Sequence, residues 1–98
     1  MAERLEDEEL KEALEDLEIW GLEAGKLSTR IEFDDYKKSV FFANTVFTLA
    51  ESHFHHPEVK VEYGAVEIDL WSHEEEAITE KDIELAEEIT EKVRSIDW

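Results

Sequence analysis

Apolar side chains recur at helical spacing in three stretches of the chain. Residues 5–18 keep leucines three or four positions apart among charged residues, which predicts an amphipathic helix. Residues 35–53 and about 80–95 show the same period. Thr79 and Asp82 have the spacing of a capping box at the start of the last stretch. The apolar face of this last helix is expected to comprise Ile83, Ala86, Ile89, Val93 and Ile96.

The helix predicted over residues 35–53 is apolar almost all the way round. Asp34 or Asp35 can cap its first turn. Its apolar residues are Tyr36, Val40, Phe41, Phe42, Ala43, Val46, Phe47, Leu49 and Ala50. Such a helix either lies at the centre of the core or is covered twice, once by its own sheet and once by a partner subunit.

Two other regions alternate in polarity, which predicts two β-hairpins. In residues 20–33, side chains that can face a core occupy every second position from Leu27 to Phe33, and Gly25 stands where the chain should turn. In residues 58–71, the alternation passes through Gly64 and Ala65, a pair that suits a two-residue type II′ turn. The register that this turn predicts pairs Tyr63 with Val66, Val61 with Ile68, Val59 with Leu70 and Lys60 with Asp69.

The predicted order of elements is helix, two strands, helix, two strands, helix. Strands joined by short loops must be antiparallel, and helices on one face of the sheet give the simplest core. We therefore expect an α+β fold of order αββαββα, with a four-stranded antiparallel sheet and helices packed on one face. The 98 residues contain no linker-like segment, so residues 1–98 are expected to form a single domain.

Charge and composition limit the partners. The 28 acidic and 10 basic residues give a formal net charge of −18, which argues against nucleic acid and against an anionic membrane surface. No apolar run could cross a bilayer and no leader opens the chain, so a cytoplasmic location is expected. The absence of cysteine excludes disulfides, thiolate nucleophiles and cysteine-type zinc sites.

The candidate chemistry lies in the histidines. All four fall within 21 residues: His53, His55, His56 and His73. Extending the second hairpin outward places His56 opposite His73, so these rings should converge at one end of it. Glu51, one helical turn before His55, could orient that ring, and Asp82 could orient His73. Clustered imidazoles with carboxylates behind them suit general acid–base catalysis near neutral pH.

The spacing of several of these residues resembles that of the pterin-4a-carbinolamine dehydratases. The matching positions are Glu51, His55-His56-Pro57, Tyr63, His73 and Asp82. The resemblance extends from Trp20 to the last helix and includes the run of residues 79–86. The fold of that family, αββαββα, agrees with the order of the predicted elements.

This resemblance implies a cofactor-free, metal-free dehydration of a 4a-hydroxytetrahydropterin to the quinonoid dihydropterin. It makes His55 and His73 the acid–base pair, with His56 binding substrate or assisting. Other residues take supporting or substrate-binding roles: Glu51 and Asp82 the first, Trp20, His56 and Pro57 the second. The family also forms dimers and tetramers, so the resemblance implies a homodimer or homotetramer. This agrees with a second helix that is apolar on nearly all sides.

Other interpretations of the histidines stay open at this point. The His55-His56-Pro57 segment could simply end a helix, since imidazoles are favoured near a helix C-terminus. The four histidines with nearby carboxylates could also bind zinc or another divalent ion, although adjacent His55 and His56 are awkward ligands for one ion. A non-catalytic pterin-binding or oligomerisation module is the third possibility.

Overall fold

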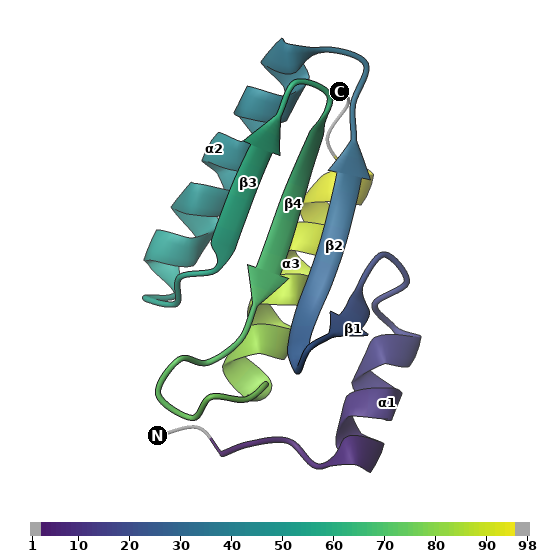
Figure 1. Ribbon diagram of the computed structural model, residues 1–98, viewed down its shortest axis with the longest axis vertical. Helices are drawn as coiled ribbons and strands as arrows, with labels where there is room; N and C mark the ends of the chain where they lie inside the picture. Colours follow the sequence, from purple (N-terminus) through teal and green to yellow (C-terminus); the bar gives the residue numbers. More distant parts are fainter. Residues whose placement is uncertain (1–2, 96–98) are drawn as a thin grey trace.

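The structure, a computed structural model, describes residues 3–95 and has the order αββαββα (Figure 1). Its elements are α1 Asp7–Glu15, β1 Gly21–Glu23, β2 Lys26–Glu32, α2 Tyr36–Ser52, β3 Glu58–Glu62, β4 Ala65–Leu70 and α3 Glu80–Ser95. The strands form one antiparallel sheet in the order β1-β2-β4-β3. The α+β class and the order of elements predicted from the sequence are thereby confirmed.

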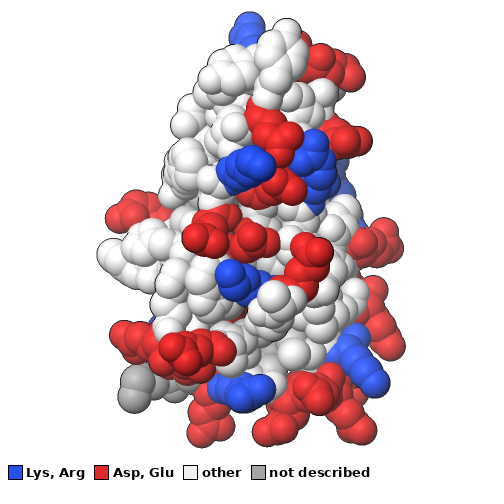
Figure 2. All heavy atoms as spheres, viewed as in Figure 1, with Lys and Arg blue, Asp and Glu red and all other residues white. Residues whose placement is uncertain are grey.

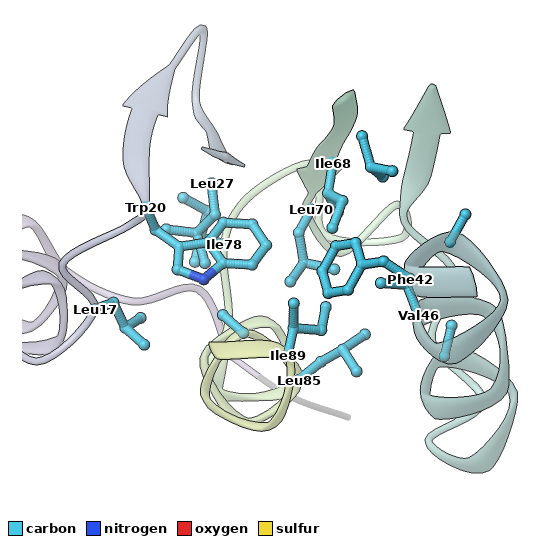
Figure 3. Close-up of a cluster of buried hydrophobic side chains, with 14 of the residues drawn as sticks. Leu17, Trp20, Leu27, Phe42, Val46, Ile68, Leu70, Ile78, Leu85 and Ile89 are labelled. Carbon is cyan, nitrogen blue, oxygen red and sulfur yellow. The ribbon is translucent and has the colours of Figure 1, made fainter. Parts of the chain in front are cut away.

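The core lies between one face of the sheet and the helices α2 and α3. In Figure 3, Phe42 of α2 and Leu85 and Ile89 of α3 point toward Ile68 and Leu70 of β4. All five side chains are fully buried, which is the main source of stability for a domain of this size. Ile96, expected on the apolar face of the last helix, lies outside the described residues.

The opposite face of the sheet is polar. Arg30 on β2 makes a two-pronged contact with Glu62 on β3, at 2.9 and 3.1 Å, and also approaches Glu67 on β4. Its hydrogen bond lowers the pKa of Glu62 below the ordinary 4.5, and the same bond raises the pKa of Arg30. Figure 2 shows acidic and basic side chains interspersed over this face, so the sheet is covered by helices on one side only.

The turn between β1 and β2 explains why residue 25 is a glycine. Ala24 and Gly25 both have positive φ, of 50° and 77°, and the strands pair directly on either side of them. Positive φ at both central residues is the requirement of a type I′ hairpin turn. Gly25 therefore stands at the turn, as predicted.

The predicted register of the second hairpin is wrong by two residues. The turn consists of Tyr63 and Gly64, and the structure pairs Val61 with Val66, Val59 with Ile68 and Lys60 with Glu67. Gly64 is required for a close approach and not for positive φ, because a Cβ there would lie 3.2 Å from the Phe33 carbonyl oxygen. A slip of two residues keeps every side chain on its face, so the predicted apolar face is nevertheless correct.

Two helices differ from their predicted extent or covering. The first is shorter than residues 5–18: Leu5 and Leu17 are buried in the core from outside α1, and Leu5 pairs with Ile78 through its backbone N–H. The second, α2, packs against the sheet and α3 on one side only. Its outward-facing Tyr36, Phe41 and Phe47 are 54 %, 58 % and 49 % exposed, so residues 3–95 leave a second apolar face of α2 exposed.

Candidate active site

The C-terminus of α2 turns His55 into the protein. The backbone N–H of Phe54 donates to the Glu51 carbonyl and that of His55 donates to the Ala50 carbonyl, both at 3.1 Å. These two bonds form a Schellman motif, with Phe54 in the left-handed conformation at φ 51°. The chain therefore reverses at Phe54, and His55 is 9 % exposed although it lies beyond the helix.

His55 is bound to a buried carboxylate. Its Nε2 contacts Oδ1 of Asp82, which is fully buried at the start of α3. Oδ2 of Asp82 accepts from the Ser72 hydroxyl at 2.9 Å and from the Thr79 backbone N–H at 2.8 Å. We assign the tautomer of His55 from this contact: opposite an ionised carboxylate, which can only accept, Nε2 is the donor and Nδ1 the nitrogen that can accept a proton. The expected pairing of Asp82 with His73 is wrong, because the Schellman turn brings His55 to Asp82 instead.

His56 has a carboxylate partner of a different kind. Its Nε2 lies 2.8 Å from Oε2 of Glu51, and the two side chains are 64 % and 73 % exposed. Glu51 was expected to orient His55 from one helical turn away. That spacing holds only inside a helix, and α2 ends at Ser52, so the expected pairing is wrong. A solvated pair of this kind adds little stability but restricts the orientation of the ring.

His73 is held by an aromatic neighbour. It lies in the exposed loop 73–76, which is closed by backbone hydrogen bonds between Ser72 and Ala77. Its ring stacks on the indole of Trp71, with centroids 4.2 Å apart and planes 19° apart. Lys26 places its Nζ 4.0 Å from the Trp71 ring centroid. The stacking on Trp71 therefore restricts the orientation of the His73 ring, as a carboxylate does for each of the other two imidazoles.

These three histidines line one open cavity of about 460 Å³. The same cavity is lined by Phe54 and Ser72, and its rim carries Glu74, Glu75 and Lys81. The strands end at the pair Glu58–Asp69, so His56 and His73 are not opposite each other in the ladder as the extended hairpin predicted. The expectation that His55, His56 and His73 converge at this end of the sheet is confirmed.

Three other residues of interest lie elsewhere. Trp20 is buried in the core, where its Nε1 donates to the Thr90 hydroxyl at 2.9 Å, and it does not line the cavity (Figure 3). Pro57 follows His56 without lining the cavity. His53 pairs with Glu88 of α3 at 2.5 Å and does not line the cavity.

The donor atoms show no compact metal site within the described residues: residues 3–95 contain no group of three or more His, Asp or Glu that could hold an ion. Nor does any helix in that range combine the length and apolarity needed to cross a bilayer. What the site does bring together is three imidazoles on one cavity, each oriented by a different neighbour. Such a set can remove a proton from one atom of a ligand and deliver one to another.

The supporting residues differ in how clearly the sequence pattern indicated them. Thr79 was expected as a helix cap, and it is also part of the network around Asp82. Ser72 was visible only as a neighbour of His73, and nothing in the pattern indicated that its hydroxyl reaches Asp82. Trp71 carried no signal, since its role depends on a loop whose shape the sequence does not reveal.

Comparisons with known proteins agree with the resemblance. The family model described as pterin 4 alpha carbinolamine dehydratase matches residues 3–92. A relative from Aquifex aeolicus is 36 % identical over 96 residues, covering 98 % of this chain and 97 % of that protein. One from Natronomonas pharaonis is 37 % identical over 91 residues, covering 93 % and 97 %. The names of both place them among the pterin-4-alpha-carbinolamine dehydratases.

Solved structures give the same result. A crystal structure from Brucella melitensis, described as a transcriptional coactivator/pterin dehydratase, superposes with a TM-score of 0.85 at 31 % identity, covering 91 % of this chain and 97 % of that one. A pterin dehydratase-like RuBisCO assembly factor of the α-carboxysome shares the fold alone, with a TM-score of 0.60 at 19 % identity over 74 % of this chain and 83 % of that one. By sequence match over nearly its full length, the chain belongs to the pterin-4a-carbinolamine dehydratase family.

Proposed function

We propose that the protein catalyses the loss of water from a 4a-hydroxytetrahydropterin to give the quinonoid dihydropterin. The observation that carries this proposal is the convergence of His55, His56 and His73 on one open cavity. Family membership supplies the substrate class, and the imidazoles supply groups that exchange protons near neutral pH.

The reaction needs two proton transfers and no change of oxidation state in the protein. One group takes the proton from N5 while another protonates the departing 4a-hydroxyl. The C4a–O bond then breaks, the N5 electron pair forms a C4a=N5 double bond, and water leaves. His55 and His73 act as this acid–base pair, and His56 binds the substrate or assists. Neither a metal nor a cofactor takes part in this scheme.

The remaining predicted residues take supporting roles in this proposal. Asp82 fixes the tautomer of His55, and Glu51 restricts the ring of His56. Pro57, expected to bind substrate, is given no contact with the pterin, because it does not line the cavity. Trp20 supports the core beneath α3 and is given no contact with the pterin, because its indole is buried away from the cavity.

The uncovered face of α2 supports a further proposal, that the chain forms a homodimer or homotetramer. Tyr36, Phe41 and Phe47 expose more apolar surface than a solvated helix of a monomer normally shows. The cytoplasmic location expected from the sequence stays a prediction.

The decisive experiment measures the rate of dehydration by ultraviolet absorbance, with and without the metal-stripped protein. We expect acceleration that survives chelation and falls by about 10²-fold or more in His55→Ala and in His73→Ala. His53→Ala is the matched control, since it removes an imidazole that does not line the cavity. Near-normal turnover in both variants would remove the assignment, and no acceleration by the folded wild type would favour a pterin or metal binder.

A further inference from the structure

Phe54 is an unusually exposed aromatic residue beside the catalytic imidazoles. Its side chain is 84 % exposed, the largest exposed fraction among the large apolar residues in the described part of the chain. It directly precedes His55 and lines the same cavity as all three histidines. The ring therefore contributes little to the core, and the residue borders the space in which the substrate would lie.

The backbone at Phe54 is also unfavourable for a phenylalanine. Its φ of 51° lies in the left-handed region, which glycine and asparagine adopt readily and bulky residues avoid. A Schellman motif normally carries glycine or asparagine at this position. Since the ring is exposed, packing does not compensate for the strain. Strained residues of this kind concentrate where function requires the side chain.

We infer that Phe54 is a substrate-contacting residue whose ring stacks on the planar part of the pterin's pyrimidine ring, formed by N1, C2, N3 and C4, on the side away from the tetrahedral C4a. This inference rests on the proposed function and deepens it. An exposed aromatic face can stack on the flat part of the pterin, while the N–H groups at the edge of the pterin remain free to donate to the carboxylates of Glu74 and Glu75, which line the same cavity. A ring stacked on Phe54 stays beside the imidazoles of His55, His56 and His73.

The chain offers a matched control for the backbone strain. Ala24 has almost the same φ, 50°, in a turn that does not line the cavity. Phe54→Asn and Ala24→Asn therefore relieve the same kind of strain, but only the first removes an aromatic ring from the cavity. Phe54→Tyr keeps the ring face, and Phe54→Leu keeps apolar bulk without it.

The experiment measures the Kd for pterin, the bare bicyclic ring, by fluorescence titration, together with thermal unfolding, sedimentation and the kinetics of dehydration. We expect both asparagine variants to melt higher, by roughly 4 °C or more. We expect Phe54→Asn and Phe54→Leu to raise the Kd and KM about 3- to 10-fold with little change in kcat. Phe54→Tyr and Ala24→Asn should keep both constants within about twofold of wild type, because one retains the stacking face and the other leaves the cavity intact.

Several results would overturn the inference. An unchanged Kd and KM in Phe54→Asn, with wild-type turnover intact, would overturn it while leaving the dehydratase standing. If Phe54→Asn changed sedimentation but neither the Kd nor the KM, the ring would be a contact between subunits and not a contact with substrate. A wild type that neither binds pterin nor accelerates dehydration would overturn both proposals. An equal rise in Kd in Ala24→Asn would trace the effect to the backbone and not to the ring.

Discussion

Replacing Asp82 with asparagine tests the pair of buried groups on which the site depends. The exchange keeps the shape of the side chain but leaves one accepting oxygen and introduces an NH₂ donor. The backbone N–H of Thr79 cannot rotate away, so the amide oxygen must stay where Oδ2 accepts that bond and the Ser72 hydroxyl. The new NH₂ then faces Nε2 of His55, which is itself a donor.

His55 can respond in two ways, and both are costly. Either the buried contact is lost, or the proton moves to Nδ1, the nitrogen left free for exchange with the substrate. A hydrogen bond to a charged group contributes about 1.5–3 kcal/mol, so we expect a loss of about 2 kcal/mol. For a domain of this length that corresponds to a melting temperature lower by roughly 8–16 °C. The wrong tautomer should lower kcat by about 10²-fold or more, since the same exchange in a buried His–Asp pair of serine proteases costs about 10⁴-fold.

Circular dichroism melts and initial rates, taken at a temperature where both proteins are folded, measure the two effects separately. Glu51→Gln makes the same exchange in the exposed pair with His56, and we expect it to change stability by no more than about 1 kcal/mol. An Asp82→Asn protein that melts with the wild type and keeps half of its turnover would refute the reasoning, because neither the buried bond nor the tautomer would then matter.

Three further predictions concern the sheet and the assembly. Arg30→Met should raise the pKa of Glu62 toward 4.5 in a carboxyl NMR titration. Because the pKa is lowered in the folded protein, Glu62 stabilises the fold at pH values above its ordinary pKa of 4.5, and this contribution is lost as the pH falls through the folded pKa. A titration of Glu62 that does not move in Arg30→Met would contradict the pairing. Gly64→Ala should lower the melting temperature by roughly 4–8 °C because its Cβ meets the Phe33 carbonyl, whereas Gly21→Ala, with open space around it, should not; equal melts would disprove the contact. Sedimentation should show a species heavier than the 11.5 kDa chain, and a clean monomer would remove the proposed interface on α2.

Periodicity was sufficient to predict the fold, because alternate side chains of β2 and β4 are buried in the core. The alternation through Val59, Val61, Val66 and Ile68 determined which side chains share a face of the sheet even though the register was wrong by two. The register of the second hairpin could be predicted only by knowing why position 64 is a glycine. A glycine needed for positive φ and one needed for close approach look the same in a sequence.

The convergence of His55, His56 and His73 could be predicted from the sequence, and the contacts of these side chains could not. The histidines converge because the strand ends they flank converge, which follows from topology. Their partners depend on where α2 stops and on the reversal at Phe54, a residue that gives no sign of a left-handed backbone. The helical turn assumed over residues 51–55 assigned Glu51 to His55 and not to His56, and Asp82 was assigned to His73 because the reversal that brings His55 to it was not foreseen.

The cavity has walls of very different rigidity. His55 and Asp82 belong to the buried unit that folds as a whole, whereas His73, Glu74 and Glu75 lie on an exposed loop. Substitutions at His55 or Asp82 lower the free energy of unfolding, whereas the loop can vary in length and composition with little effect on stability. Laboratory evolution toward a bulkier or differently charged pterin should therefore collect its substitutions on the loop and leave His55 and Asp82 untouched. The same division would let related chains diverge in substrate while conserving their chemistry.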